Sequence, residues 1–430
     1  MSNTHCYDFD VVIVGGGPAG MAAAGIAAEG HRVAIVDENF GLGGQIWRGQ
    51  SAASSAENAA GRAITEWYRR AQEKEITHLA GLRVFASPRP GILHAEGPEG
   101  LCELRYDKLI LAAGARERFL PFPGWTLRNV MGAGGLQAMV KSGLPIAGKR
   151  VVIAGSGPLL LAGAAYLHQR RAEIVAICEQ TSLGRLAGFS LQLLGDPQKL
   201  QQGVQYRWQL RKTVYRAGWW PVEAHGNGRV ESVVISNGVV TRELSCDYLA
   251  CGYHLVPNTE LPALMGCEIK NGSVAVDALQ QTSVSNVLCA GESTGIGGLE
   301  KSLIEGEIAG LASTGRAKQA QPLLRKKEKL LRFAAAMDRT FALRSELRHL
   351  PTSDTLICRC EDVSFERMRE HDCWRSAKLH TRCGMGACQG RVCGAAAEFL
   401  FGWNADSVRP PVLPVRYGTI AAVSAAQESL

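Results

Sequence analysis

The sequence predicts an α/β protein in which one strand–glycine turn–helix plan occurs twice and a small cysteine-rich region follows. Two observations lead to this prediction. A β-branched run ends in a glycine-rich turn near the N-terminus, and the same pattern returns near residue 150. Six of the 13 cysteines then fall within the 36 residues from Cys358 to Cys393. Clustered thiolates are typical ligands of soft metals and iron–sulfur clusters.

The first copy carries a dinucleotide fingerprint. The run Val11–Val14 ends in G-G-G-P-A-G at 15–20, an alanine-rich helix follows, and the next strand, Val33–Val36, ends in Asp37. Such glycines allow a tight turn, a close approach of the backbone to a pyrophosphate, and close packing of helix on strand. The acid, 22 positions after Gly15, is placed to bind a ribose. The residues expected at this site are Gly15, Gly17, Pro18, Ala19, Gly20, Asp37 and Glu38.

Three later segments favour FAD over NAD as this dinucleotide. A G-G-Q loop follows the second strand, where a second pyrophosphate loop would lie. A late strand, Tyr106–Gly114, ends in small residues beside the expected adenosine. An A-G-E sequence then precedes the loop Ser293–Gly298 and can place an acid on the ribityl chain. The residues expected to bind FAD here are Gly43, Gly44, Gln45, Ala113, Gly114, Gly291, Glu292 and Gly297.

The second copy departs from the fingerprint. Its turn reads Gly155-x-Gly157-x-x-Leu160, so a leucine stands where the third glycine belongs. We expect this leucine to push the helix away from the strand. Glu179 could still hold a ribose hydroxyl, which leaves an NADH-dependent reductase as the alternative to a degenerate fold.

The cysteine-rich region reads C-R-C at 358–360 and T-R-C-G-M-G-A-C-Q-G-R-V-C at 381–393. Four thiolates fit a [2Fe–2S] cluster. They also fit structural zinc, although the C-x2-C knuckles that zinc favours are missing from this region. Zinc and unligated thiols therefore remain alternatives, and a non-enzymatic scaffold with a structural nucleotide and zinc remains as a rival function. Arg359, Arg382 and Arg391 would offset the negative charge of a cluster.

Residues 8–315 resemble the flavoproteins with two dinucleotide-binding domains, which include the glutathione reductase-like enzymes. The resemblance rests on the glycine turn, the G-G-Q loop and the A-G-E segment. It implies two Rossmann-like domains, the first with FAD. In that family the acid of the last segment is usually Asp, so Glu292 is a departure that keeps the charge. No cysteine pair follows Gly43-Gly44, which argues against disulfide reduction. Cys246 and Cys251 are expected to be buried thiols.

The cysteine-rich region resembles the bacterioferritin-associated-ferredoxin-like [2Fe–2S] domain. Its C-x-C-E-x-V start and its G-M-G-x-C-Q-G-x-x-C end carry this likeness. The resemblance assigns the cluster ligands to Cys358, Cys360, Cys388 and Cys393. It leaves Cys373 and Cys383 as spares, although the long interval between the last two ligands leaves Cys383 open as a substitute for Cys393.

Taken whole, the chain resembles the FAD-dependent α subunits of heteromeric amine and amino-acid dehydrogenases. These include opine oxidases, D-hydroxyproline dehydrogenases, sarcosine oxidase-like complexes and one component of hydrogen cyanide synthase. The resemblance implies an oxidase-like β subunit with its own FAD, which oxidises the substrate while the α subunit passes electrons on. It also allows a small γ subunit, FMN at the subunit interface, and a quinone or the respiratory chain as acceptor. No catalytic acid–base residue is identified in this chain.

The predicted organisation follows from these motifs. The FAD-binding domain is expected at 1–118 and 284–315, a degenerate NAD-binding-like domain at 119–283, a helical linker at 316–354, the [2Fe–2S] domain at 355–404, and an extended tail at 405–430. The net charge of +7 is spread along 430 residues, which does not indicate nucleic-acid binding. With no export signal or membrane span recognised, we expect a cytoplasmic protein that reaches the inner membrane only through partners.

Overall fold

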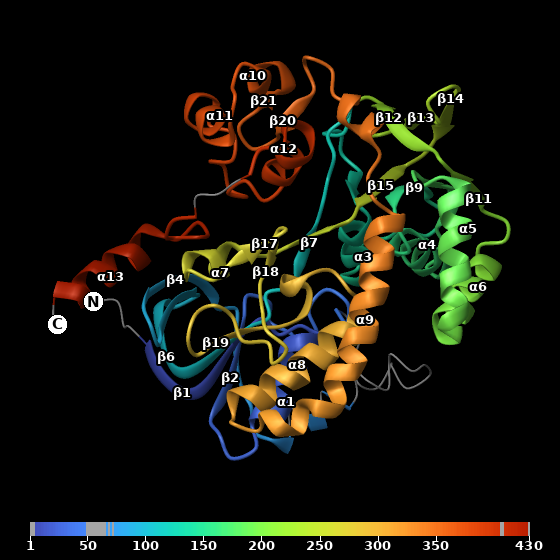
Figure 1. Ribbon diagram of the computed structural model, residues 1–430. Coiled ribbons are helices and arrows are strands. Elements are labelled where there is room, and N and C mark those ends of the chain that lie inside the picture. Colours follow the sequence, from blue (N-terminus) through green and yellow to red (C-terminus); the bar gives the residue numbers. More distant parts are fainter. Residues whose placement is uncertain (1–4, 49–65, 68, 71–72, 405–407, 429–430) are drawn as a thin grey trace. The chain divides into compact units, whose positions relative to one another are not determined.

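The computed structural model describes residues 5–48, 66–67, 69–70, 73–404 and 408–428. The chain forms two compact units (Figure 1). The first unit comprises Met1–Arg116, Val256–Ala334 and Ser407–Leu430, and the second comprises Glu117–Leu255 and Ala335–Asp406. Each unit contains a mainly parallel sheet with helices, which confirms the predicted α/β class with a repeated plan.

The first unit is built on a seven-stranded sheet of order β3-β2-β1-β6-β5-β4, with β19 also paired to β6. Its strands are β1 (His5–Val14), β2 (Val33–Asp37), β3 (Thr77–Ala80), β4 (Arg83–Arg89), β5 (Ile92–Gly97), β6 (Gly100–Leu111) and β19 (Val287–Cys289). Val14 is in register with Val36 and Leu111, and Leu111 with Cys289. Because these four strands run parallel, the segments that follow them emerge at one edge of the sheet, where ligands bind in such folds.

Two glycine-containing helices cover this sheet. They are α1 (Pro18–Ala27) and α8 (Leu299–Ser313), which pack side by side (Figure 1). A Cβ on Gly306 would lie 2.2 Å from the Ala19 carbonyl oxygen, and one on Gly310 would lie 2.6 Å from that of Ala23. Glycine at both positions therefore permits the close contact. This contact brings the loop before α8 next to the turn before α1.

The second unit repeats the plan with a five-stranded sheet of order β11-β10-β9-β15-β8. Its strands are β8 (Val130–Gly132), β9 (Arg150–Ser156), β10 (Glu173–Glu179), β11 (Val214–Ala217) and β15 (Tyr248–Tyr253), and a separate sheet holds β12 (Trp220–His225), β13 (Ser232–Ser236) and β14 (Thr241–Ser245). Its helices include α3 (Ala133–Lys141), α4 (Leu159–Gln169), α5 (Leu183–Gln192) and α6 (Pro197–Gln209).

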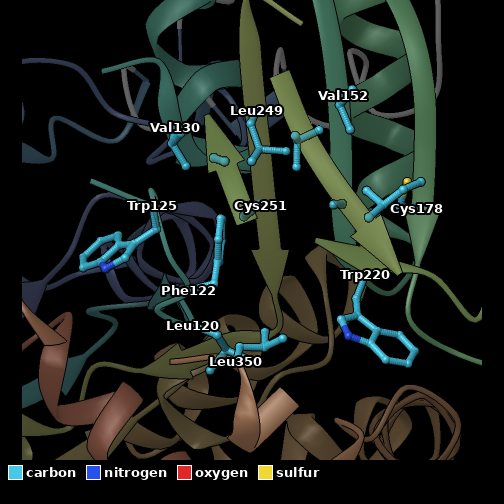
Figure 2. Close-up of a cluster of buried hydrophobic side chains, with 14 of the residues drawn as sticks. Leu120, Phe122, Trp125, Val130, Val152, Cys178, Trp220, Leu249, Cys251 and Leu350 are labelled. Carbon is cyan, nitrogen blue, oxygen red and sulfur yellow. The ribbon is translucent and has the colours of Figure 1, made fainter. Parts of the chain in front are cut away.

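Buried side chains of both sheets form one core of the second unit. Figure 2 shows Val152, Cys178 and Leu249 on strands that face aromatic residues such as Trp220. Cys246 and Cys251 are both fully buried, as expected from the sequence. Burial raises the pKa of the Cys246 thiol to about 12, so this cysteine is a protonated apolar side chain at neutral pH.

The C-terminal part of the second unit consists of short elements. They are η5 (Ser345–His349), β20 (Leu356–Cys358), β21 (Val363–Ser364), α10 (Phe365–Arg369), α11 (Trp374–Thr381) and α12 (Cys393–Phe401). This part is anchored to the rest of its unit, because the Trp125 indole N–H donates to the Leu356 carbonyl (2.6 Å) and Arg118 pairs with Glu398 (3.3 Å). The preceding helix α9 (Gln321–Thr340) lies in the predicted helical linker.

The tail differs from the prediction in its second half. The Val412 N–H donates to the Phe85 carbonyl (2.9 Å), and the Arg416 guanidinium bonds Glu96 (3.1 Å), so residues 412–416 lie on the first unit's own sheet. The chain then forms α13 (Tyr417–Glu428) instead of remaining extended. Alanines are strong helix formers, and two pairs of them lie in this stretch, whereas the prolines that suggested an extended tail all lie before it.

Several shorter elements connect the larger ones. They include β7 (Ala115–Glu117), β16 (Leu255–Pro257), α7 (Glu260–Leu264), β17 (Ile269–Lys270) and β18 (Ser273–Val274). None of the helices in the described ranges has the length and apolar content needed to cross a membrane.

Candidate functional site: a dinucleotide edge and a cluster of thiols

The glycine turn of the first unit has the form that a pyrophosphate requires. A Cβ on Gly20 would lie 1.9 Å from the Gly15 carbonyl oxygen, so only glycine lets α1 start this close to β1. Gly15 itself has φ +110°, a conformation that favours glycine. Among the described residues, no atom lies within 4 Å of the position that a Cβ on Gly17 would take. The turn at Gly17, just before the start of α1, thus leaves room for the close approach of an anion, whereas Pro18 and Ala19 are buried.

Asp37 lies beside this turn at the end of β2. Its carboxylate accepts the Gly16 N–H (2.5 Å) and the Asn39 N–H (2.7 Å), and the side chain is 8% exposed. Its neighbour Glu38 is exposed. His78 on β3 is half-buried, and burial lowers the pKa of its imidazole while Asp37 opposes this shift. The pairing of acid and turn matches the expected ribose site.

The G-G-Q loop closes on the same turn. The Gly43 N–H donates to the Gly16 carbonyl (2.7 Å), and a Cβ on Gly44 would lie 3.0 Å from the Gly17 Cα. Gln45 follows directly. Trp47, two residues after Gln45, is 1% exposed, and its indole N–H has no partner among the described residues. A buried donor without a partner is uncommon and fits a polar ligand at this place.

Ala113 and Gly114 reach the edge at the end of β6. The Asn258 side chain donates to the Ala113 carbonyl (2.8 Å), and the Asn258 backbone N–H donates to the Gly114 carbonyl (3.0 Å). The Ser293 hydroxyl also donates to the Gly114 carbonyl (3.0 Å). These bonds connect the small-residue end of β6 with the A-G-E loop, as the predicted FAD site requires.

A buried ion pair holds the A-G-E loop. The Lys301 ammonium donates to the Gly291 and Gly295 carbonyls (3.0 and 2.9 Å) and pairs with Glu305 (2.9 Å). Both charged side chains are only 1% exposed. A Cβ on Gly297 would lie 2.2 Å from the Lys301 side chain, which explains the glycine there. A buried cation that satisfies several carbonyls fixes the loop conformation.

Glu292 is the acid of this loop, and one of its oxygens is unused. Its Oε1 accepts the Gly298 N–H (2.8 Å), whereas Oε2 is buried and has no hydrogen-bond partner among the described residues. Burial raises the pKa of this carboxyl. A buried carboxyl oxygen without a partner is expected where a ligand hydroxyl binds. The residues of the edge therefore fit FAD.

Three thiols meet in the C-terminal part of the second unit. The Sγ atoms of Cys358, Cys383 and Cys393 all lie within 4.8 Å of one another, and all three side chains are buried. Cys358 ends β20 and Cys393 begins α12. Cys383 lies just after α11. Arg382, between them, adopts a left-handed conformation (φ +67°) that ends the helix and turns the chain back towards the other thiols.

Two further thiols adjoin this group. The Cys388 sulfur contacts the thiols of both Cys393 and Cys360. Two of the four predicted ligands, Cys358 and Cys393, lie in the group of three, and Cys388 and Cys360 lie beside it. The third member of the group is Cys383, which was expected to be a spare. Cys373 stands apart, because its exposed sulfur accepts the Ser376 N–H at the start of α11.

Hydrogen bonds favour the thiolate forms of two of these cysteines. The thiols of Cys383 and Cys393, followed by backbone N–H groups, hold the pKa of Cys358 well below its usual range. The Cys393 thiol lowers the pKa of Cys388 to about 5. Thiolate is the form that binds soft metals, so this donor set fits an iron–sulfur cluster and also fits zinc.

The glycines of this region are required by close contacts. A Cβ on Gly386 would lie 2.3 Å from that of Cys360, and one on Gly384 would lie 2.7 Å from the Trp374 ring. Of the three arginines expected to offset cluster charge, Arg382 pairs with Glu361 (2.8 Å) and Arg359 lies over the Trp125 ring. The Arg391 guanidinium donates to the Cys388 carbonyl (3.4 Å).

Sequence reasoning missed several residues of the first site: Trp47, His78, Asn258, Lys301 and Glu305. The last two carried a signal that was available, because a lysine and a glutamate four apart in a glycine- and alanine-containing helix are placed to pair. The others act through contacts between distant segments and have no local pattern.

Known proteins resemble the chain over most of its length. The family model for "Pyridine nucleotide-disulphide oxidoreductase" matches residues 9–320. The hydrogen cyanide synthase subunit HcnB of Pseudomonas protegens is 34% identical over 419 residues, covering 89% of each chain. The A subunit of the opine oxidase of Rhizobium meliloti is 31% identical over 467 residues, covering 96% of this chain and 98% of that protein. The resemblance inferred from the motifs is confirmed.

Solved structures show the same fold at lower identity. L-proline dehydrogenase from P. horikoshii has a TM-score of 0.69 at 20% identity and covers 98% of this chain and 81% of its own. Thioredoxin reductase from T. acidophilum has a TM-score of 0.54 at 20% identity and covers 72% of this chain and 99% of its own.

Proposed function

The chain belongs to the pyridine nucleotide-disulphide oxidoreductase family of FAD-dependent enzymes, and from this premise we propose that it is the electron-transferring α subunit of a heteromeric FAD/[2Fe–2S] dehydrogenase. The substrate would be an amine, an imino acid, a D-amino acid or an opine, oxidised on a β subunit. The observation that carries the proposal is the group of three buried thiols, with two more beside it, in a flavoprotein whose relatives are named as subunits.

In this proposal each unit holds one redox group. FAD accepts two electrons and can release them singly, and a [2Fe–2S] cluster accepts one at a time. The open turn at Gly17 and Asp37 would bind the pyrophosphate and the ribose, and Glu292 would accept a ribityl hydroxyl. Cys358, Cys360, Cys388 and Cys393 would hold the cluster.

The proposed partners are those that the resemblance of the sequence motifs implies. They are an oxidase-like β subunit with its own FAD, a small γ subunit, FMN at the subunit interface, and a quinone or the respiratory chain as electron acceptor. We place this complex in the cytoplasm, with the inner membrane reached through partners. A second candidate function is that of a hydrogen cyanide synthase component, which the 34% identity to HcnB favours.

The first experiment measures cofactors in the protein purified without oxygen. We expect bound flavin, bound iron, and a rhombic EPR signal after reduction by dithionite. Cys388→Ser and Cys360→Ser should lose iron and keep flavin, while the exposed Cys373→Ser keeps both. Zinc in place of iron, or iron loss in Cys373→Ser alone, would overturn the cluster assignment.

The second experiment asks where the substrate is oxidised. The chain is expressed alone and together with an oxidase-like subunit encoded beside it, and dye reduction is measured with amines, imino acids, D-amino acids and opines. We expect activity only for the pair. Full activity of the chain alone, free of partner, would show that the relay assignment is wrong.

A further inference from the structure

The second glycine turn is closed by a segment of its own unit. The Gly157 N–H, which would face a phosphate in a working site, donates to the buried Glu179 carboxylate (2.7 Å). The same carboxylate accepts the Thr181 N–H (2.8 Å). Leu160, in the place of the third glycine, is 1% exposed. The groups that a dinucleotide would use are therefore already engaged or covered.

A second set of hydrogen bonds holds the chain after α9 against the edge of the sheet where β9 and β15 end. The Phe341 carbonyl accepts hydrogen bonds from the Ser156 hydroxyl (2.9 Å) and from the His254 Nε2 (2.5 Å). Ser156 is the residue between the two glycines of the turn. Ser156 ends β9 and His254 directly follows β15, and the ends of such parallel strands are where a nucleotide binds in these folds.

Gln180 directly follows β10, and its side chain hydrogen-bonds to backbone groups on both ends of the segment Phe341–Arg344. Its side-chain NH2 donates to the Phe341 and Ala342 carbonyls (3.4 and 3.3 Å), and its Oε1 accepts the Arg344 N–H (3.1 Å). The Gln180 side chain is fully buried. A buried side-chain amide that makes three hydrogen bonds to backbone groups fixes the position of the segment that carries them.

The Phe341 ring occupies the space over the turn. Its Cγ lies 4.0 Å from the position that a Cβ on Gly157 would take, and the ring packs edge-to-face on Phe189 of α5 at 5.2 Å between centroids. Phe341 is 4% exposed. An apolar ring at this place excludes a hydrated pyrophosphate.

We propose that the segment Phe341–Arg344 permanently occupies the nucleotide edge of the second unit and converts this fold into a scaffold that leads into the cysteine-rich part. The fold then takes neither NADH nor an adenine nucleotide. The inference goes beyond the proposed relay, since it concerns what the second unit does, and each can fail without the other.

The test combines nucleotide titration with hydrogen exchange on the flavin-loaded protein. NADH, NADPH and ATP are each added in a calorimeter, and amide exchange is followed over residues 338–346. We expect no saturable binding below about 1 mM, which corresponds to about 4 kcal/mol, and unchanged exchange. Micromolar binding of any of the three nucleotides at this edge would overturn the proposal, and faster exchange at Arg344 would identify the edge as the place of binding.

A variant tests the hydrogen bonds of Gln180 directly. Gln180→Ala should make the Arg344 amide exchange about tenfold faster, the factor produced by about 1.4 kcal/mol of lost hydrogen bonding. Gln202→Ala is the matched control, because Gln202 is an exposed glutamine on α6 whose side chain donates to the Tyr206 hydroxyl of the same helix. Unchanged exchange in Gln180→Ala would contradict the proposal. If that variant does not fold, Ser156→Ala removes one bond to Phe341 and should give a smaller change in the same direction.

Discussion

The two glycine turns of this chain share one architecture and differ in what lies above them. In the first unit, Gly20 lets the helix close on the strand, and no described atom lies within 4 Å of a Cβ on Gly17. In the second, Leu160 fills the place of the third glycine, and the Phe341 ring lies over Gly157. The strands, helices and edge acid are retained in both. In our proposal, whether this fold binds a dinucleotide therefore depends on a few atoms at the turn, and the sheet persists without such binding in the second unit.

The largest effect is expected when Gly20, the third glycine of the first turn, is replaced by leucine, the residue at the equivalent position of the second turn. Gly20→Leu would place a side chain where a Cβ alone comes within 1.9 Å of the Gly15 carbonyl oxygen. We expect the purified protein to lose its flavin, with FAD binding weakened more than about 100-fold, since about 2.8 kcal/mol of strain is sufficient for that change. The ratio of flavin absorbance to protein absorbance measures it. Gly203→Leu on α6, where a Cβ meets no atom of the described residues within 4 Å, should retain flavin. Retention of flavin by both variants would refute the role of close packing.

A second large effect should follow from Lys301, the buried cation under the first site. Lys301→Met leaves the Glu305 carboxylate buried without its partner, which we expect to lower the free energy of unfolding by about 3–5 kcal/mol. Lys270→Met is the matched control, because Lys270 is 66% exposed and pairs with Glu268 on the surface. Its effect should stay within about 0.5 kcal/mol. Urea unfolding of both variants compares them, and equal stabilities would show that the ion pair does not hold the loop.

An intermediate effect should separate the two edge acids. Asp37→Asn replaces a carboxylate that accepts two backbone N–H groups, and charged hydrogen bonds contribute about 1.5–3 kcal/mol, so FAD affinity should fall roughly 10- to 100-fold. Glu179→Gln makes the equivalent change in the second unit. It should leave FAD affinity unchanged. Fluorescence titration of the flavin-free proteins with FAD gives both values, and a similar loss in Glu179→Gln would mean that the second edge also contributes to flavin binding.

The smallest effect concerns pH. Burial raises the pKa of Glu292 in the folded protein. Such a group stabilises the fold fully below its unfolded pKa, and this contribution is lost as the pH rises through the folded pKa. In the flavin-free protein, Glu292→Gln should therefore gain stability relative to the wild type as the pH rises from about 4 towards 8. Thermal unfolding across this range measures the difference. Glu328→Gln, at an exposed glutamate, is the matched control variant, and a flat difference for Glu292→Gln would contradict the raised pKa of this carboxyl.

The sequence predicted the features that depend on local chemistry. The glycines at 15–20, the acid after β2 and the thiol-rich loops are recognisable because each requires a residue type at a fixed spacing. It did not predict that Phe341 would lie over Gly157, since 184 positions separate them. Nor did it predict that the Cys383 sulfur would lie within 4.8 Å of those of Cys358 and Cys393, because that depends on the left-handed turn at Arg382. The helix α13 was missed because three nearby prolines gave a stronger local signal than its alanines.

The difference between the two turns also explains why electrons would enter this chain from a partner and not from a nicotinamide nucleotide. If only the first turn binds a dinucleotide, NADH has no place from which to reduce the flavin.

The most direct test is an anaerobic titration of the flavin-loaded protein with NADH, monitored in the visible flavin absorbance band, with dithionite as the positive control. We predict that dithionite bleaches the flavin and that NADH, even in excess, leaves it oxidised. Stoichiometric bleaching by NADH would contradict the account, because it would require the second unit to deliver a nicotinamide to the flavin.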